Sequence, residues 1–231
     1  MNTEVTDTSR RNRDIFVFFL STLLLFVPNC SMVQKFADSS RPYHTGDYEA
    51  NLDEWTREAR IHRGLEVALI LSTTFKSKPF RRAYAREYAA AYKLNAEETK
   101  DFLEDHVAAA DLGHEFLLAA FVPQADWDDF DDSDSMWRLR MVTEGAGRIR
   151  PAEIRRIKEK DALLSHFFPY ITPWKSVYVV RFPNTLDNQR RPSERPERVI
   201  LEIASVLGST QMEWQLENRQ EIHDSRAQGS E

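Results

Sequence analysis

The sequence predicts a mainly β domain, an antiparallel β-sandwich with a two-helix insertion after its first strand. Three observations lead to this prediction. Six or seven short segments are apolar, or alternate between apolar and polar residues, as strands do. Turn residues separate them at short intervals, which is typical of antiparallel sheets. Two helical segments lie together at about 79–112 instead of alternating with strands. An α+β domain with helices on one face of its sheet is the alternative.

The first predicted strand lies within residues 55–75. Its second half, residues 65–75, is rich in aliphatic and β-branched side chains, as a buried strand is. Gly64 is either a bulge within one long strand or the C-cap of a short helix before it. We favour the single long strand.

Two helices with readable caps follow this strand. Pro79 stands in the first turn of one helix, where proline is well tolerated. Aromatic residues recur at every fourth position along it: Phe80, Tyr84, Tyr88 and Tyr92. Asn95 and Glu98 predict a capping box for the second helix, and Gly113 predicts its end. The aromatic stripe is expected to pack in the core. An interaction surface is the alternative, because tyrosine is enriched at protein interfaces.

The rest of the predicted domain consists mainly of strands. They are expected at residues 114–122, 136–142, 149–157, 176–182, 199–207 and 210–216, with a short helix at 162–168. Pro151 interrupts the third of these segments and therefore favours an edge strand there.

Length and charge limit the organisation of the chain and its partners. With 231 residues, of which 42% are hydrophobic, the chain has room for one globular domain, predicted at 47–217. Residues 30–46 are expected to form a flexible tether and residues 218–231 a disordered tail. The net charge of −6 argues against a nucleic-acid partner, which requires a concentrated basic face.

Residues 1–29 have the pattern of an export signal. Arg10, Arg11 and Arg13 precede an apolar run at 15–27, and the only cysteine, Cys30, follows soon after. The run is shorter than the ~20 apolar residues that a helix needs to cross a bilayer. We therefore predict a signal peptide, with an uncleaved inner-membrane signal anchor as the alternative.

The end of the run resembles the lipobox of bacterial lipoproteins, because Val27 stands three residues before Cys30. Pro28 and Asn29 depart from the small residues usual at their positions. The resemblance implies that Cys30 begins the mature chain and carries acyl groups such as palmitate. Since Ser31 follows in place of aspartate, it also implies the outer membrane, facing the periplasm. The expected partners are this membrane and another envelope protein.

The most acidic stretch of the sequence is a candidate calcium site. It contains six aspartates in nine positions: Asp126, Asp128, Asp129, Asp131, Asp132 and Asp134. Carboxylates are the oxygen ligands that calcium prefers. An EF-hand alignment fails, because Asp134 stands where glycine is needed and Arg140 where the glutamate belongs. We prefer a solvated loop whose Trp127 and Phe130 fold back onto the domain.

The segment at 148–160 has the opposite charge and is expected to face the acidic loop, a partner or anionic lipid, or to protect an edge strand. Motifs for zinc hydrolases, serine hydrolases and nucleotide binding are missing, so no catalytic residue and no cofactor are predicted. The sequence favours a lipid-anchored interaction or accessory module. A calcium- or ligand-binding module and an envelope hydrolase with dispersed catalytic residues are the alternatives.

Overall fold

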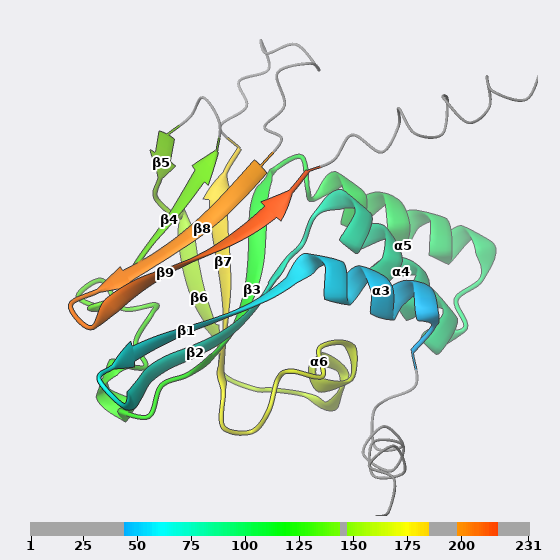
Figure 1. The fold of residues 1–231 in the computed structure, drawn as a ribbon. Helices are drawn as coiled ribbons and strands as arrows, with labels where there is room; N and C mark the ends of the chain where they lie inside the picture. The colour runs from blue at the N-terminus through cyan, green and yellow to red at the C-terminus, as the bar shows by residue number, and fades with distance from the viewer. Residues whose placement is uncertain (1–43, 144–146, 185–197, 217–231) are drawn as a thin grey trace, which may run out of the picture. The chain divides into compact units, whose positions relative to one another are not determined.

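Two antiparallel sheets form the framework of the domain (Figure 1). The computed structural model describes residues 44–143, 147–184 and 198–216. Sheet A has the strand order β1-β2-β3-β7-β6, and sheet B the order β5-β4-β8-β9. The strands are β1 (Thr56–Arg63), β2 (Glu66–Phe75), β3 (Gly113–Phe121), β4 (Arg138–Thr143), β5 (Gly147–Ile149), β6 (Glu153–Ile157), β7 (Ser176–Pro183), β8 (Arg198–Ser205) and β9 (Gly208–Gln215). The predicted mainly β, sandwich-like class is confirmed.

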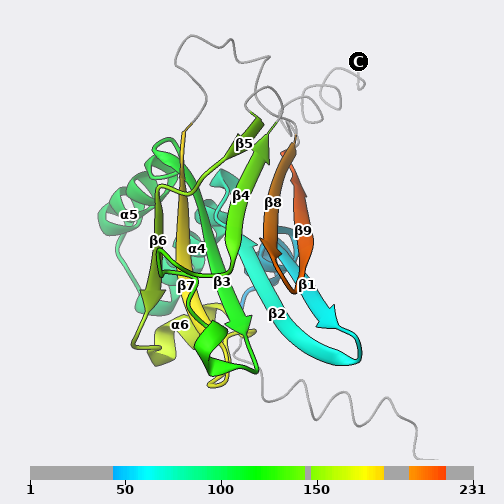
Figure 2. The ribbon, with the colours of Figure 1, turned by 90° about the vertical axis from the view of Figure 1, so that its left-hand side faces the viewer.

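Sheet A has sheet B on one side and helices on the other (Figure 2). The helices are α3 (Gly46–Trp55), α4 (Lys78–Tyr92), α5 (Ala96–Ala108) and α6 (Ala162–Phe167), with a short 3₁₀ helix, η1 (Ala125–Trp127). Alternate residues of a strand point to opposite faces. Phe116 of β3 therefore packs on Trp214 of sheet B, with ring centroids 5.3 Å apart. The neighbouring Glu115 points instead toward Arg81 of α4.

The stretch predicted as one long strand is a hairpin, so that prediction was wrong. β1 pairs with β2 in antiparallel register, from Thr56 opposite Thr74 to Arg63 opposite Glu66. Gly64 makes the turn with φ +63°, a conformation that glycine adopts at little cost. The helix pair α4–α5 therefore follows the second strand rather than the first. Its predicted caps are present, including the full Asn95 capping box.

Helix α3 was missed, because no element was predicted between the tether, which was expected to end at residue 46, and the strand region that begins at residue 55. Tyr48, Leu52 and Trp55 are its buried residues and recur at helical spacing. Thr45 caps it, since its side chain accepts a hydrogen bond from the Tyr48 backbone N–H. His44, the residue before this cap, is also buried, with only 5% of its surface exposed. The packed domain thus includes the last residues of the predicted tether.

The segment at 149–157 divides between the two sheets. β5 ends at Ile149 and lies at the edge of sheet B, whereas β6 begins at Glu153 and lies at the edge of sheet A. Pro151 stands between them, so the chain changes sheets where proline prevents strand pairing. On the opposite side of the sandwich, β1 adjoins β9, where Arg57 Nε donates to the Glu213 carbonyl at 3.0 Å.

Candidate functional site

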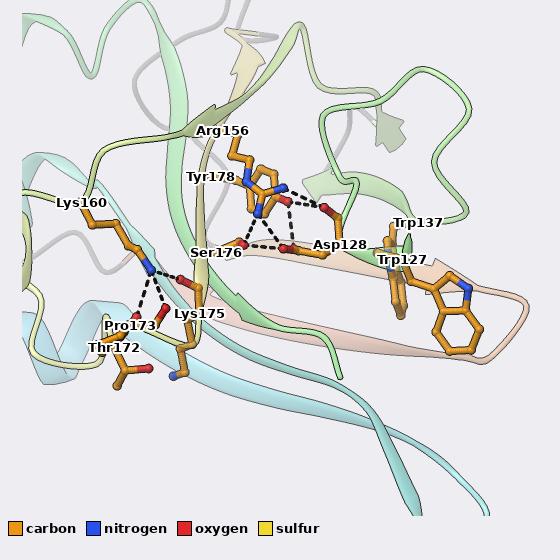
Figure 3. Close-up of polar contacts among 10 residues, drawn as sticks. All are labelled: Trp127, Asp128, Trp137, Arg156, Lys160, Thr172, Pro173, Lys175, Ser176 and Tyr178. Carbon is orange, nitrogen blue, oxygen red and sulfur yellow. Dashed lines mark hydrogen bonds and ion pairs between the residues drawn. The ribbon is translucent and has the colours of Figure 1, made fainter. Parts of the chain in front are cut away.

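Asp128 is the most heavily bonded residue of the acidic loop (Figure 3). Its Oδ1 accepts a hydrogen bond from the Tyr178 hydroxyl at 2.9 Å, and its Oδ2 accepts one from Arg156 Nη2 at 2.8 Å. The Ser176 hydroxyl donates to the same Oδ2. Burial, and then the Asp128 carboxylate, raise the pKa of Tyr178, which keeps the phenol protonated as a donor. All these bonds end on protein groups, so they hold the loop against β6 and β7.

The aromatic residues of the loop support the same anchoring role. Phe130 is buried and stacks on Trp137, with ring centroids 5.3 Å apart and planes 6° from parallel. Trp137 Nε1 donates to the Trp127 carbonyl at 2.6 Å. The loop therefore folds back onto the domain through Phe130, as the solvated-loop interpretation expected of this residue.

The candidate calcium ligands are distributed around this anchor. Asp128 is engaged as described, and Asp129 accepts a hydrogen bond from the Ser135 hydroxyl at 2.9 Å. Asp132 accepts one from the Asp134 backbone N–H at 3.0 Å. Within residues 44–143, 147–184 and 198–216, no three His, Cys, Asp or Glu side chains are grouped so as to hold a metal ion. The calcium site stays a prediction.

A second polar chain links β1, β2 and the segment before β7. Lys175 Nζ donates to Ser72 Oγ at 2.8 Å, and Ser72 Oγ donates to Glu58 at 3.2 Å. Burial lowers the pKa of Lys175. A serine beside such a lysine is a possible nucleophile. However, Ser72 is 0% exposed, so a substrate carbonyl cannot reach its Oγ in this conformation. The chain is placed to hold the segment before β7 on sheet A.

Lys160 holds the same segment through three backbone carbonyls (Figure 3). Its ammonium donates to the carbonyls of Thr172, Pro173 and Lys175 at 3.3, 2.9 and 2.9 Å. These bonds use all three donors of the lysine. Two cations of the basic segment at 148–160 thus have structural partners: Lys160 binds these carbonyls, and Arg156 binds Asp128. The basic segment therefore does face the acidic loop, through Arg156.

A buried polar network lies in the helical layer. Glu87 of α4 accepts hydrogen bonds from the Thr45 hydroxyl at 2.6 Å and from the Thr45 backbone N–H at 3.2 Å. His44 Nδ1 lies 3.3 Å from the same carboxylate, and His44 Nε2 lies 2.6 Å from the His166 carbonyl. Burial alone raises the pKa of Glu87, but the hydrogen bonds from Thr45 and His44 offset this and lower it. The network joins the start of α3 to α4 and α6.

The predicted aromatic stripe of α4 forms contacts between helices. Phe80 is buried, Tyr84 and Tyr88 are half-buried, and Tyr92 is 51% exposed. Tyr88 stacks on Phe102 of α5 at 4.4 Å between ring centroids. No residue of α5 is fully buried. The stripe thus begins in the core at Phe80 and ends at the surface at Tyr92. Helix α5 covers only part of it.

An apolar hollow, the α4–α6 groove, opens beside this stripe. It holds about 190 Å³. Its walls come from α4, α6 and the end of β6, and its lining residues are Tyr84, Ile157, Glu159, Asp161, Leu163, Leu164, Phe167 and Phe168. A second hollow of about 170 Å³ lies near the β1–β2 turn, beside Pro123 and Trp127. Both are smaller than the ~300–1,000 Å³ of typical small-molecule sites. The groove has room for one or two apolar side chains.

Comparison with known proteins assigns no function to this geometry. No protein-family model, curated protein or solved structure matches the chain. No helix of the described residues is long and apolar enough to cross a bilayer. The predicted export signal and Cys30 lie outside the described residues, so both stay predictions.

Proposed function

We propose that this chain is an accessory module of the bacterial cell envelope that binds another protein and is held at the membrane by a lipid on Cys30. The observation that carries the interaction role is the α4–α6 groove, which opens between the stripe residue Tyr84 and the edge strand β6. Partly open apolar side chains gathered at one place are typical of partner sites. The polar groups around Asp128, Ser72 and Glu87 are satisfied by structural partners, which favours binding over chemistry.

Site-specific photo-crosslinking in living cells tests the interaction role. A photoreactive amino acid replaces Leu163, which lines the groove, or Gln211, an exposed residue of β9 that serves as the matched control. We expect a discrete cross-linked species from position 163 and none from position 211. The same products from both positions, or none from either, would contradict the proposal.

The membrane attachment rests on the N-terminal signal and is tested separately. We expect mass spectrometry of the mature protein to find a chain that starts at an acylated Cys30. Its Cys30→Ser variant should lose the lipid and leave the membrane fraction. A chain that begins elsewhere with a free thiol at Cys30 would exclude the lipid anchor. A chain that retains residues 1–29 would indicate the signal-anchor alternative.

A further inference from the structure

The imidazole of His44 lies between a carboxylate and a backbone carbonyl. Its side chain is 2% exposed, and that of Glu87 is 8% exposed. Nδ1 of the ring lies 3.3 Å from Glu87 Oε1 in α4, and Nε2 lies 2.6 Å from the backbone carbonyl of His166 in α6. A neutral imidazole has one N–H, so it can donate to one of these acceptors and would turn a lone pair toward the other. Only the imidazolium donates to both.

The other contacts of Glu87 place the proton on His44 rather than on the carboxyl group. The Thr45 hydroxyl donates to Oε2 at 2.6 Å, and the Thr45 backbone N–H donates to Oε1 at 3.2 Å. Donors on both oxygens favour the ionised form. Burial raises the pKa of Glu87, but the bonds from Thr45 and His44 outweigh it and lower the pKa. Glu87 is therefore the carboxylate of a buried ion pair with His44.

His44 also holds the end of α6. The last carbonyls of a helix have no partner within it. In α6 these carbonyls accept hydrogen bonds from the N-terminal segment instead, because His44 donates to His166 and the Tyr48 hydroxyl donates to Phe167 at 2.6 Å. Through Glu87 the same imidazole is bonded to α4. It thus bridges the two helices that line the α4–α6 groove.

We infer that His44 is a pH-sensitive clamp, whose imidazolium form holds α6 against α4 and fixes the walls of the α4–α6 groove. Both bonds require the charged ring, so they are present at low pH, and one is lost as pH rises through the titration of His44. The clamp depends only on the contacts described. Its effect on a bound partner rests on the proposed function, because α6 forms one wall of the groove.

The titratable groups around His44 leave this response to His44 itself. Within the described residues, those that face it are Glu87, Tyr48 of α3 and His166, whose ring centroid lies 4.5 Å from that of His44. Burial, and then the charge of His44, lower the pKa of His166, although Glu87 acts in the opposite direction. Burial raises the pKa of Tyr48, which keeps its phenol protonated as a donor. His166 therefore stays neutral while His44 is charged.

NMR of the full-length protein measures the protonation state of His44 directly. Imidazolium and neutral imidazole differ in their side-chain ¹⁵N chemical shifts, and His44→Gln identifies the signal by its loss. We expect His44 to pass from imidazolium to the neutral ring between about pH 5 and pH 9, the range in which histidines titrate. Hydrogen–deuterium exchange of residues 162–168 is followed over the same range. The protection of α6 should fall with the same midpoint as the His44 signal.

Matched variants separate the clamp from general effects of pH. His44→Gln replaces two donors on opposite sides of a ring with one uncharged amide. At about pH 6, α6 should exchange about tenfold faster in this variant than in the parent, as expected for a lost hydrogen bond to a charged group. At about pH 9 this difference should be small. His62→Gln is the control, since His62 is exposed on β1, at the opposite edge of sheet A from β6. It should match the parent at both pH values.

Two results would overturn the clamp, and both are measured on the parent, so they hold even if His44→Gln does not fold. One is a His44 ring that keeps a single protonation state over the whole range. The other is protection of α6 that does not follow the titration of His44.

The effect on binding has a separate measurement. The photo-crosslink from position 163 should weaken in His44→Gln and persist in His62→Gln. An unchanged cross-link in both variants would exclude an effect of the clamp on the partner. The lack of a cross-link in the parent would contradict the proposed function, and with it the effect on binding, while the NMR and exchange results would still decide the clamp.

Discussion

The carboxylate of Glu115 lies among three positively charged side chains. Lys76 Nζ lies 2.7 Å from Oε1 of its carboxylate, while Arg181 Nε and Arg81 Nη2 lie 2.9 and 3.8 Å from Oε2. Burial raises the pKa of Glu115, but the three cations outweigh it and lower the pKa to about 2. A carboxyl with a lowered folded-state pKa stabilises the fold above its ordinary pKa, and this contribution is lost as pH falls toward the folded value.

The pH dependence of stability should therefore depend on Glu115. Between pH 7 and pH 3 the parent should lose about 2 kcal/mol more of its free energy of unfolding than Glu115→Gln, because each pKa unit is worth about 1.4 kcal/mol. The glutamine keeps the shape of the side chain but cannot titrate. Urea unfolding at both pH values measures the difference. Parallel pH profiles for the two proteins would show that the cations around Glu115 contribute no pH-dependent stability.

Single residues also show what the sequence could not reveal about the site. Asp128 was one of six equivalent aspartates, and its three partners lie 28, 48 and 50 positions away in the chain. The only sequence signal was alternation, which places Ser176 and Tyr178 on one face of β7. Register then decides that Arg156 stands opposite Tyr178. Neither loop closure nor register can be read from local pattern.

At the scale of elements, the acidic loop divides into an anchor and a solvated part. Asp128→Asn should cost about 2 kcal/mol, because its amide group would face Arg156 and two hydroxyl donors in place of a carboxylate. Asp131→Asn is the control, since Asp131 is exposed and should change stability by less than about 0.5 kcal/mol. Thermal unfolding monitored by circular dichroism measures both. Equal effects of the two changes would contradict the anchoring role of Asp128.

Calcium tests the solvated part of the same loop. We expect no change in melting temperature on adding calcium to the parent. A true site would stabilise the fold by about 2.7 kcal/mol at a hundredfold excess over Kd. That corresponds to a rise of roughly 5–10 °C for a domain of this size. The informative variant replaces Asp131, Asp132 and Asp134 with asparagine and leaves the Asp128 anchor intact. A rise in the parent that disappears in this variant would establish the calcium site.

Local signals predicted most elements, and the failures occurred where two interpretations shared one pattern. The capping box at Asn95 fixed the start of α5 because its chemistry is specific. Gly64 was ambiguous because glycine serves bulges, C-caps and turns alike. Only pairing across the hairpin identifies it as a turn. Helix α3 carried the correct spacing at Tyr48, Leu52 and Trp55, but its polar surroundings concealed it.

At the scale of the whole molecule, distant parts of the chain close the two sides of the sandwich. On one side the indole of Trp214 in β9 donates to the Trp55 carbonyl at 2.9 Å. On the other, the acidic loop is fastened by Asp128 to β6 and β7. The predicted class depended on strand count and turn spacing, so it could be obtained from the sequence. These closures depend on contacts between distant segments, so they could not.

The last prediction concerns the N-terminal boundary of the domain. The hydrogen bonds of His44 and Thr45 to Glu87 place this boundary before residue 44. A fragment of residues 44–216 should unfold in one cooperative transition, and a fragment of residues 47–216 should be about 3 kcal/mol less stable in urea. The shorter fragment loses the Thr45 cap of α3, worth ~1 kcal/mol, and leaves the Glu87 carboxylate buried without His44 and Thr45.

Glu87→Gln in both fragments separates the two losses. Glutamine has no charge that could be left buried and unpaired. Removal of residues 44–46 should therefore lower the free energy of unfolding by about 1–2 kcal/mol less than it does with glutamate. The stability that is still lost comes from the missing Thr45 cap, a loss that the Glu87→Gln substitution does not change. Equal stability of the two original fragments would show that His44 and Thr45 lie against the domain without supporting it. The lack of a cooperative transition in residues 44–216 would place the domain boundary elsewhere.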